Sequence, residues 1–199
     1  LSLRPDFPLA HSLMAGLYER VDRLEAAIAA DRKIAASSAY GWDARRRVAS
    51  NLDRLDRVEE SRAILEDMAQ ERPERTDVLA DLGDLMRVRE RWEEAVSAYD
   101  RALDRVSQLT EADWALLYTR GIALERADQW DRAELDFLKA LELHPDQPLV
   151  LNYLGYTWIE QGQRYDEALG MLKKSVELRP RDGYIADSLG WVYYRLGDY

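Results

Sequence analysis

A small residue recurs at nearly constant intervals along this chain of 199 residues. It stands at Ala15, Ala49, Gly83, Gly121, Gly155 and Gly190. The intervals between these positions are 34, 34, 38, 34 and 35 residues. Self-similarity with a period of about 20–50 residues is typical of repeat architectures, in which each copy buries its apolar face against its neighbours. The chain is therefore predicted to fold as a stack of similar units.

Each unit contains two segments with helical patterning. In the fourth unit, Leu117, Gly121 and Leu124 are spaced four and three residues apart, which predicts one apolar face of an α-helix. A second small residue follows the first by 12 or 13 positions, at Ala27, Ser61, Ala95, Ala133 and Ala168. Small residues on both helices let the two backbones approach closely, and Pro145 ends the second helix because proline cannot continue it. No segment shows the sustained alternation of a strand, so we expect an all-α fold.

This pattern resembles the tetratricopeptide repeat (TPR) family. The agreement is strongest at residues 114–147, where the family's marked positions hold Leu117, Gly121, Leu124, Ala133, Phe137, Ala140 and Pro145. The third unit agrees nearly as well, through Leu79, Leu82, Gly83, Ala95, Tyr99 and Ala102. The resemblance implies a right-handed α-solenoid of helix–turn–helix hairpins, with five full repeats and the first helix of a sixth.

We expect residues 1–199 to form a single solenoid. The repeats are placed at 8–41, 42–75, 76–113, 114–147, 148–182 and, in part, 183–199. Residues 1–7 resemble the ends of later second helices, so they are interpreted as the tail of a preceding repeat and the chain as a fragment of a longer array.

Several positions depart from the family pattern. Asp31 stands where Tyr or Phe is expected, and Arg45 replaces a bulky apolar residue, so we expect the first two repeats to pack less well. Four extra residues near 105–110 correspond to about one helical turn, which predicts a lengthened helix. One extra residue within 162–168 is expected to lie in a turn. Thr110 to Asp113 read as a capping box that opens the fourth unit.

Composition argues against several classes of function. The chain has no Cys, and its two histidines, His11 and His144, are far apart in sequence, so no metal site or other cofactor is expected. A net charge of -10 repels phosphate backbones, which argues against nucleic acid as a partner. The basic cluster at 44–47 is interpreted as a solvated or partner-facing patch. No apolar run is long enough to span a membrane. Paired carboxylates at 59–60 and 93–94 fall at helix starts, where they favour the helix dipole, so we expect no enzyme.

The family resemblance implies a concave groove lined by the first helices, at positions flanking each small residue. The candidate partner-binding residues are Arg46, Arg54, Arg87, Tyr118, Ile122, Asn152, Tyr156, Tyr184, Trp191 and Tyr194. This groove is expected to be charged towards the N-terminus and aromatic towards the C-terminus. For the aromatic candidates, packing against a neighbouring repeat is the competing interpretation. Trp158 and Tyr193 stand three positions after the small residue and are expected in the core.

The predicted function is a non-enzymatic scaffold that binds a protein or peptide of unknown identity. One TPR subclass binds acidic C-termini of chaperones through paired Lys and Asn, but the matching positions hold Arg46 with Ser50 and Ala80 with Asp84, which excludes that function. The alternatives are self-association into a homo-oligomer through uncapped ends, or an accessory domain of a larger enzyme or envelope-assembly protein. Residues 152–162 and 187–199 resemble bacterial TPR proteins, some of them exported, which favours the cell envelope without deciding the compartment.

Overall fold

The computed structural model describes residues 7–196, and in this range the chain is helical with no β-strand. By their contacts the residues fall into two compact units, one ending at Arg105 and the other beginning at Val106, which we call unit 1 and unit 2 and treat separately. The expected all-α fold is confirmed. Of residues 1–7, which are interpreted as the tail of a preceding repeat, 1–6 lie outside the described residues.

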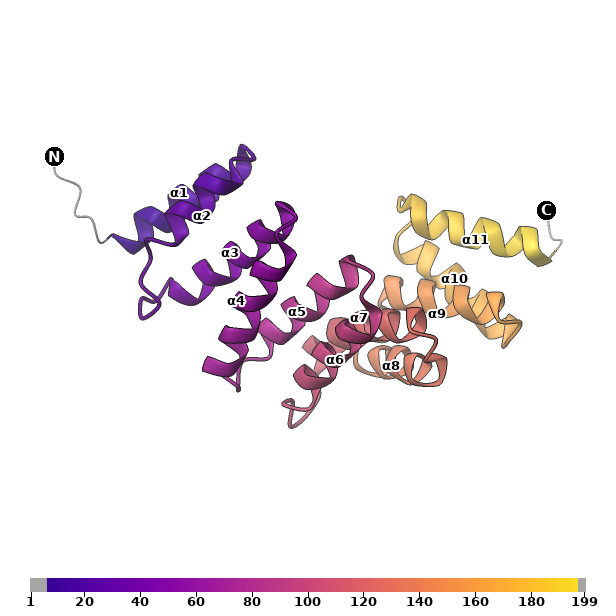
Figure 1. Cartoon of the computed structure of the whole chain (residues 1–199). Helices are drawn as coiled ribbons and strands as arrows, with labels where there is room; N and C mark the ends of the chain where they lie inside the picture. The colour runs from indigo at the N-terminus through magenta and orange to yellow at the C-terminus, as the bar shows by residue number, and fades with distance from the viewer. Residues whose placement is uncertain (1–6, 197–199) are drawn as a thin grey trace. The chain divides into compact units, whose positions relative to one another are not determined.

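Unit 1 contains six helices in three pairs (Figure 1). They are α1 (Pro8–Arg20), α2 (Leu24–Asp31), α3 (Gly41–Arg54), α4 (Val58–Glu71), α5 (Asp77–Val88) and α6 (Trp92–Leu103). Each odd-numbered helix packs on the helix that follows it, and α2 and α4 also pack on the first helix of the next pair. Unit 1 is therefore a row of three hairpins.

Unit 2 repeats this arrangement (Figure 1). Its elements are the 3-10 helix η1 (Glu111–Asp113) and the α-helices α7 (Trp114–Arg126), α8 (Trp130–Leu143), α9 (Pro148–Glu160), α10 (Tyr165–Leu178) and α11 (Gly183–Leu196). The helices α7 and α8 form one hairpin and α9 and α10 another, while α11 packs on both α9 and α10.

The two helices of a hairpin meet at the recurring small residue. A methyl carbon placed on Gly121 would lie 2.6 Å from the ring of Phe137, and one placed on Gly83 would overlap the ring of Tyr99. Both rings are fully buried. The ring of the second helix thus fills the space left by the missing side chain on the first. Where the small residue is Ala49, the opposing position holds the smaller Leu65, which is also buried.

One backbone turn recurs between the two helices of each hairpin. Seven positions after the small residue, the chain adopts a left-handed conformation, with φ of 55°, 61°, 57°, 57° and 72° at Asp22, Asp56, Glu90, Asp128 and Gly162. The next N–H then donates to a carbonyl five residues earlier, as from Arg57 to Leu52 at 2.8 Å. This is the Schellman arrangement, which satisfies carbonyl groups left open at a helix end. The turn sets the angle at which each second helix returns.

The expected weak packing of the first repeat has a specific compensation. Asp31, which replaces the aromatic residue, is buried, and Arg47 of the next hairpin donates to its carboxylate from Nε at 3.0 Å and from Nη2 at 2.5 Å. Burial raises the pKa of Asp31 above its ordinary value even though the guanidinium opposes that shift. A charged pair between hairpins therefore occupies the place of an aromatic ring.

Two expectations at the inserted segments had different outcomes. The extra residue after Gly162 lies in the turn before α10, as expected. The prediction of a lengthened helix near 105–110 is wrong, because α6 ends at Leu103 and the next helical residue is Glu111. The capping box explains this result: the backbone N–H and the hydroxyl of Thr110 both donate to Asp113 Oδ2, at 2.7 and 2.8 Å. These bonds begin a new 3-10 turn instead of extending the old helix.

Core placement at the C-terminal helix also differs from expectation. Trp158 is fully buried, as predicted. Tyr193 is only half-buried, with the Lys173 ammonium 5.8 Å from its ring centre, and its neighbour Val192 is the fully buried residue. Within the described residues no second helix follows α11 to cover Tyr193, and its ring lies beside Lys173 of α10.

Ion pairs tie consecutive hairpins of unit 1 together. Arg91 reaches Glu59 of the preceding hairpin at 2.8 Å, Arg89 reaches Asp53 at 2.6 Å, and Arg101 reaches Glu66 at 2.9 Å. Each such pair is partly solvent-exposed and contributes little on its own. Together, however, these pairs penalise a hairpin that is displaced along its neighbour.

The close contact at Gly121 gives a stability prediction. Gly121→Leu forces the side chain into the Phe137 ring and should lower the free energy of unfolding by about 1–3 kcal/mol. The matched control is Gly170→Leu, because Gly170 is exposed on α10 with no atom within 4 Å of an added methyl carbon. Chemical denaturation compares the two. Equal stability of both variants would show that the Gly121 contact does not constrain the hairpin.

The Glu66–Arg101 pair gives a pH prediction. The hydrogen bonds from Arg101 lower the pKa of Glu66 below its ordinary value of 4.5. The stabilisation from this carboxylate is therefore complete above about pH 4.5 and is lost as the pH falls through the lower folded-state pKa. Glu66→Gln should destabilise the protein at pH 7 and differ less from the parent near pH 3. Chemical denaturation between pH 3 and pH 7 measures the free energy of unfolding of the parent and the variant, with exposed Glu177→Gln as control. A stability difference between the parent and Glu66→Gln that does not change with pH would contradict this prediction.

Candidate partner-binding site

The cavity with the strongest aromatic character lies in unit 2. Its volume is about 770 Å³, and it lies along α11, with contributions from α9 and the end of α7. It is lined by Arg126, Tyr156, Tyr184, Asp187, Ser188, Gly190, Trp191 and Tyr194. We call it the aromatic cavity. Four of the ten predicted partner-binding residues are thus brought together: Tyr156 of α9 lies with three residues of α11 that follow it by 28 or more positions in sequence.

Helical spacing explains why these rings share one surface. Tyr184, Trp191 and Tyr194 stand seven and three residues apart on α11, so they lie on one face of the helix. The rings of Trp191 and Tyr194 are stacked, with centres 5.5 Å apart and planes inclined by 27°. Tyr184, Trp191 and Tyr194 are 64%, 42% and 59% exposed. Clustered exposed aromatic side chains are typical of interaction sites rather than of ordinary surface.

Hydrogen bonds hold part of the aromatic cavity in place. The indole N–H of Trp191 donates to Glu160 Oε1 at 2.9 Å, which links α11 to the end of α9. The guanidinium of Arg195 lies 3.9 Å from the same carboxylate. Burial, followed by the charge of Glu160, raises the pKa of Tyr156, so this phenol stays protonated at neutral pH.

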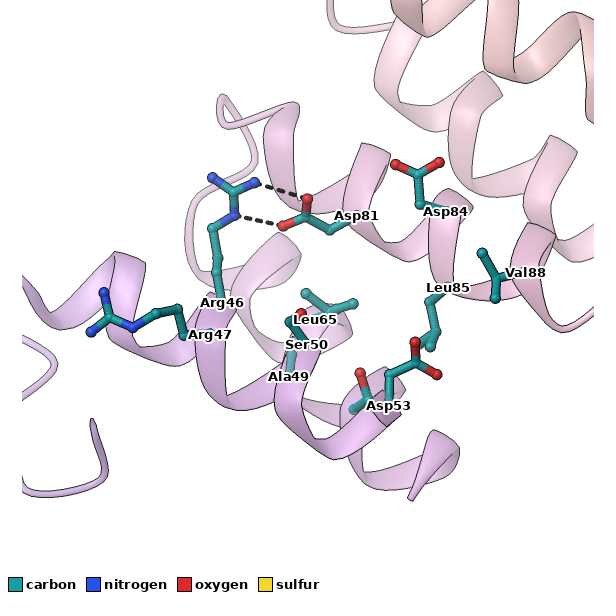
Figure 2. Close-up of a pocket in the computed structure, with 11 residues that line it drawn as sticks. Arg46, Arg47, Ala49, Ser50, Asp53, Leu65, Asp81, Asp84, Leu85 and Val88 are labelled. Atoms are coloured by element: carbon teal, nitrogen blue, oxygen red, sulfur yellow. Dashed lines mark hydrogen bonds and ion pairs between the residues drawn. The ribbon is translucent and has the colours of Figure 1, made fainter. Parts of the chain in front are cut away.

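A second cavity lies in unit 1 and is polar. Its volume is about 350 Å³, and Figure 2 shows side chains of α3 and α5 around it. Arg46 donates to both carboxylate oxygens of Asp81, at 2.5 and 2.8 Å, and to Asp77 at 3.0 Å. Figure 2 also shows the Arg47 side chain extending away from Asp81; its guanidinium binds Asp31. These guanidinium groups therefore already have carboxylate partners inside the protein.

The remaining predicted arginines are also engaged. Arg54 lies 2.8 Å from Asp22 of the preceding hairpin. Arg87 donates to Asp84 at 3.1 Å and to the hydroxyl of Tyr99 at 3.3 Å. A partner that used these arginines would have to displace bonds that organise unit 1.

Besides Arg54 and Arg87, three more predicted residues do not line either cavity: Tyr118, Ile122 and Asn152. Tyr118 packs in an aromatic cluster, with its ring centre 6.1 Å from those of both Phe137 and Tyr153, which corresponds to the competing interpretation for this residue. Ile122 is half-buried. Asn152 is only 1% exposed; its Nδ2 donates to Ser188 Oγ at 3.3 Å, and its Oδ1 has no hydrogen-bond partner. The expectation that Asn152 faces a partner is therefore wrong for this structure, because α11 covers it.

Sequence reasoning missed some residues of these surfaces. Asp81 was not proposed, although its separation of 35 residues from Arg46, close to one repeat, matches a contact between neighbouring first helices. Ser188 was also missed, and here no pattern would have singled it out. Gly190 was identified as a recurring small residue but not as a partner-binding candidate; it lines the aromatic cavity, and no atom lies within 4 Å of a methyl carbon added to it.

Two further kinds of site, metal-binding clusters and membrane-spanning helices, can be assessed for the described residues. Within residues 7–196, no three His, Asp or Glu side chains are grouped so that they could hold a metal ion. None of the helices in this range is long and apolar enough to cross a membrane.

A sequence model described as the tetratricopeptide repeat matches residues 47–110 and 118–182, more than half of the chain. The chain belongs to the tetratricopeptide repeat family. Arrays of such repeats commonly present concave binding surfaces to other proteins, so this TPR protein belongs to a family of interaction scaffolds.

Individual relatives agree with this assignment. The TPR repeat-containing protein PA4667 of Pseudomonas aeruginosa is 39% identical over 85 residues, which is 43% of this chain and 14% of PA4667. The chain thus spans a small part of that relative's length. The crystal structure of TTC0263, a thermophilic TPR protein of Thermus thermophilus, has a TM-score of 0.69 at 18% identity, and the match covers 94% of this chain and 100% of TTC0263.

A further similar structure is that of YrrB, described as a TPR protein with an unusual peptide-binding site. Its TM-score is 0.64 at 22% identity, and the match covers 92% of this chain and 91% of YrrB. At this identity the likeness supports the fold alone.

Proposed function

We propose that this TPR protein is a non-enzymatic scaffold that binds a peptide or partner protein through the aromatic cavity of unit 2. The observation that carries the proposal is the set of four rings, those of Tyr156, Tyr184, Trp191 and Tyr194, around one cavity of about 770 Å³. Aromatic side chains dominate binding energy because they bury large areas while losing few rotatable bonds.

The contrast between the two cavities supports this choice of site. The arginines of the unit 1 cavity are neutralised by neighbouring carboxylates, so a ligand would gain little by replacing those contacts. The rings of Tyr184, Trp191 and Tyr194 are substantially exposed, and the bond from Trp191 to Glu160 limits the freedom of its ring. A surface ordered in advance binds at lower entropic cost.

The comparison with YrrB lends further support, since that TPR protein is described as having a peptide-binding site. The charged pairs that span the hairpins favour a structural role over proton transfer, in line with a non-enzymatic function. The match to a short part of PA4667 is also compatible with an interaction domain inside a longer protein.

Loss of the rings should abolish partner capture. The variant Tyr156→Ala/Trp191→Ala removes rings from two helices and should reduce the recovery of specific partners from a lysate at least about tenfold, as expected for interface hot spots. Affinity capture with quantitative mass spectrometry measures the effect, and circular dichroism checks that helix content is unchanged.

The control is Tyr165→Ala, an exposed ring at the start of α10 that does not line the aromatic cavity. It should leave capture intact. If the double variant folds and captures the same partners as the parent, the aromatic cavity is not the binding site.

A second function, self-association, is favoured by the exposed face of α1. Leu17 is 60% exposed, and Leu13 and Met14 next to it are exposed as well. The positions equivalent to Leu17 in later repeats are buried by neighbouring hairpins: Asn51, Leu85, Thr157 and Val192. We propose that a second copy of this chain covers the α1 face, because Leu13, Met14 and Leu17 form an exposed apolar surface in an otherwise acidic protein.

Light scattering coupled to size exclusion tests self-association at high micromolar concentration. The parent should form dimers or larger species, and Leu13→Glu/Leu17→Glu should remain monomeric because it places carboxylates on the α1 face. Val88→Glu, at an exposed apolar residue elsewhere in unit 1, should behave as the parent. A monomeric parent would refute self-association without affecting the aromatic cavity.

A further inference from the structure

We propose that the aromatic cavity recognises an arginine side chain of the partner, with the guanidinium stacked on Trp191 and paired with Asp187. This inference rests on the proposed function, because it assumes that the partner enters this cavity. It adds the chemical class of the group that is recognised. Both the ring geometry and the balance of charge in the cavity favour such a group.

The rings offer flat surfaces suited to a planar cation. Trp191 and Tyr194 present a stacked pair, and Tyr156 and Tyr184 line the same cavity. A cation is attracted to the negative face of an aromatic ring, most strongly to that of Trp, and guanidinium also stacks because it is planar. The ring of Trp191 is held by its bond to Glu160, so this surface exists before a partner arrives.

The charges around the cavity leave one carboxylate uncompensated. Arg126 lies 3.4 Å from Glu125, and Arg195 lies 3.9 Å from Glu160, so both cations already have acidic neighbours. Asp187 is exposed, lines the cavity and forms no ion pair or hydrogen bond through its side chain within residues 7–196. The chain as a whole carries a net charge of -10. A cationic group is therefore favoured over an anionic one.

Arginine fits this combination better than lysine. A guanidinium can stack on a ring with its face while its N–H groups bind a carboxylate at its edge, in a two-point geometry that an ammonium does not provide. The phenol oxygens of Tyr156 and Tyr184 add further acceptors at the cavity wall. The partner is thus inferred to carry an exposed arginine in a segment that can enter a cavity between helices.

The test uses the full chain and short peptides of defined sequence. The probe is acetyl-Gly-Gly-Arg-Gly-Gly-amide, and its matched control replaces Arg with citrulline, which keeps the shape but removes the charge. Binding is followed by NMR through the indole N–H signal of Trp191, assigned with Trp191→Phe. The Arg peptide should shift this signal in a saturable manner and bind at least about tenfold more tightly than the citrulline peptide.

Variants of the protein separate the two parts of the site. Asp187→Asn should weaken binding of the Arg peptide about tenfold while the melting temperature stays unchanged, because this carboxylate has no structural bond to lose. Trp191→Leu should weaken it similarly. The control is Asp166→Asn, an exposed carboxylate on α10 outside the cavity, which should bind as the parent does.

Three results would overturn the inference: equal binding of the Arg and citrulline peptides, no effect of Asp187→Asn, or no shift of the Trp191 signal at millimolar peptide. Tighter binding of a peptide with Glu at the central position would identify Arg126 and Arg195 as the ligands instead. If any of these occurs while Tyr156→Ala/Trp191→Ala still abolishes partner capture, the proposed function stands and only the arginine inference fails. If that double variant captures normally, the proposed function fails as well.

Discussion

The structure depends on one contact, in which the second helix of each hairpin packs against a small residue on the first. At Gly83 and Gly121 the opposing residue is a buried aromatic ring, and a side chain on the glycine would overlap it. At Ala49 the opposing residue is Leu65, and at Ala15 it is Asp31. The two positions therefore balance in volume, because a close-packed interior tolerates neither a void nor an overlap.

The contact between the small residue and the second helix determines how closely the two helices of each hairpin pack. The left-handed turn that follows it brings the second helix back against the first in each hairpin, and within each unit the next first helix packs on that second helix. Residues one repeat apart then become neighbours, as Arg46 and Asp81 do in unit 1 and Trp191 and Glu160 do in unit 2. A periodic sequence is in this way converted into continuous surfaces that mix side chains from several repeats.

The two units use those surfaces differently. In unit 1 many surface residues are charged and pair with one another: Arg46 and Arg54, which looked available in the sequence, bind carboxylates of neighbouring hairpins, and Arg87 binds Asp84 of its own helix. In unit 2 the corresponding positions of α11 are aromatic, and their rings are exposed. The candidate site is therefore located by which side chains the fold leaves exposed, and not by residue type alone.

The sequence by itself determined the all-α repeat fold, the close contacts at Gly83 and Gly121 and the burial of Trp158, because these follow from periodicity and side-chain volume. It also identified the rings that line the aromatic cavity, since positions on one helix face can be counted. Only the tertiary structure decided that Asn152 is covered by α11, that Tyr193 is half-buried and that the segment after Leu103 is not helical. The tertiary structure likewise revealed that the guanidinium groups of Arg46 and Arg87 already bind carboxylates of the protein. These outcomes depend on which groups from other helices lie nearby, and spacing within a single helix does not determine those neighbours.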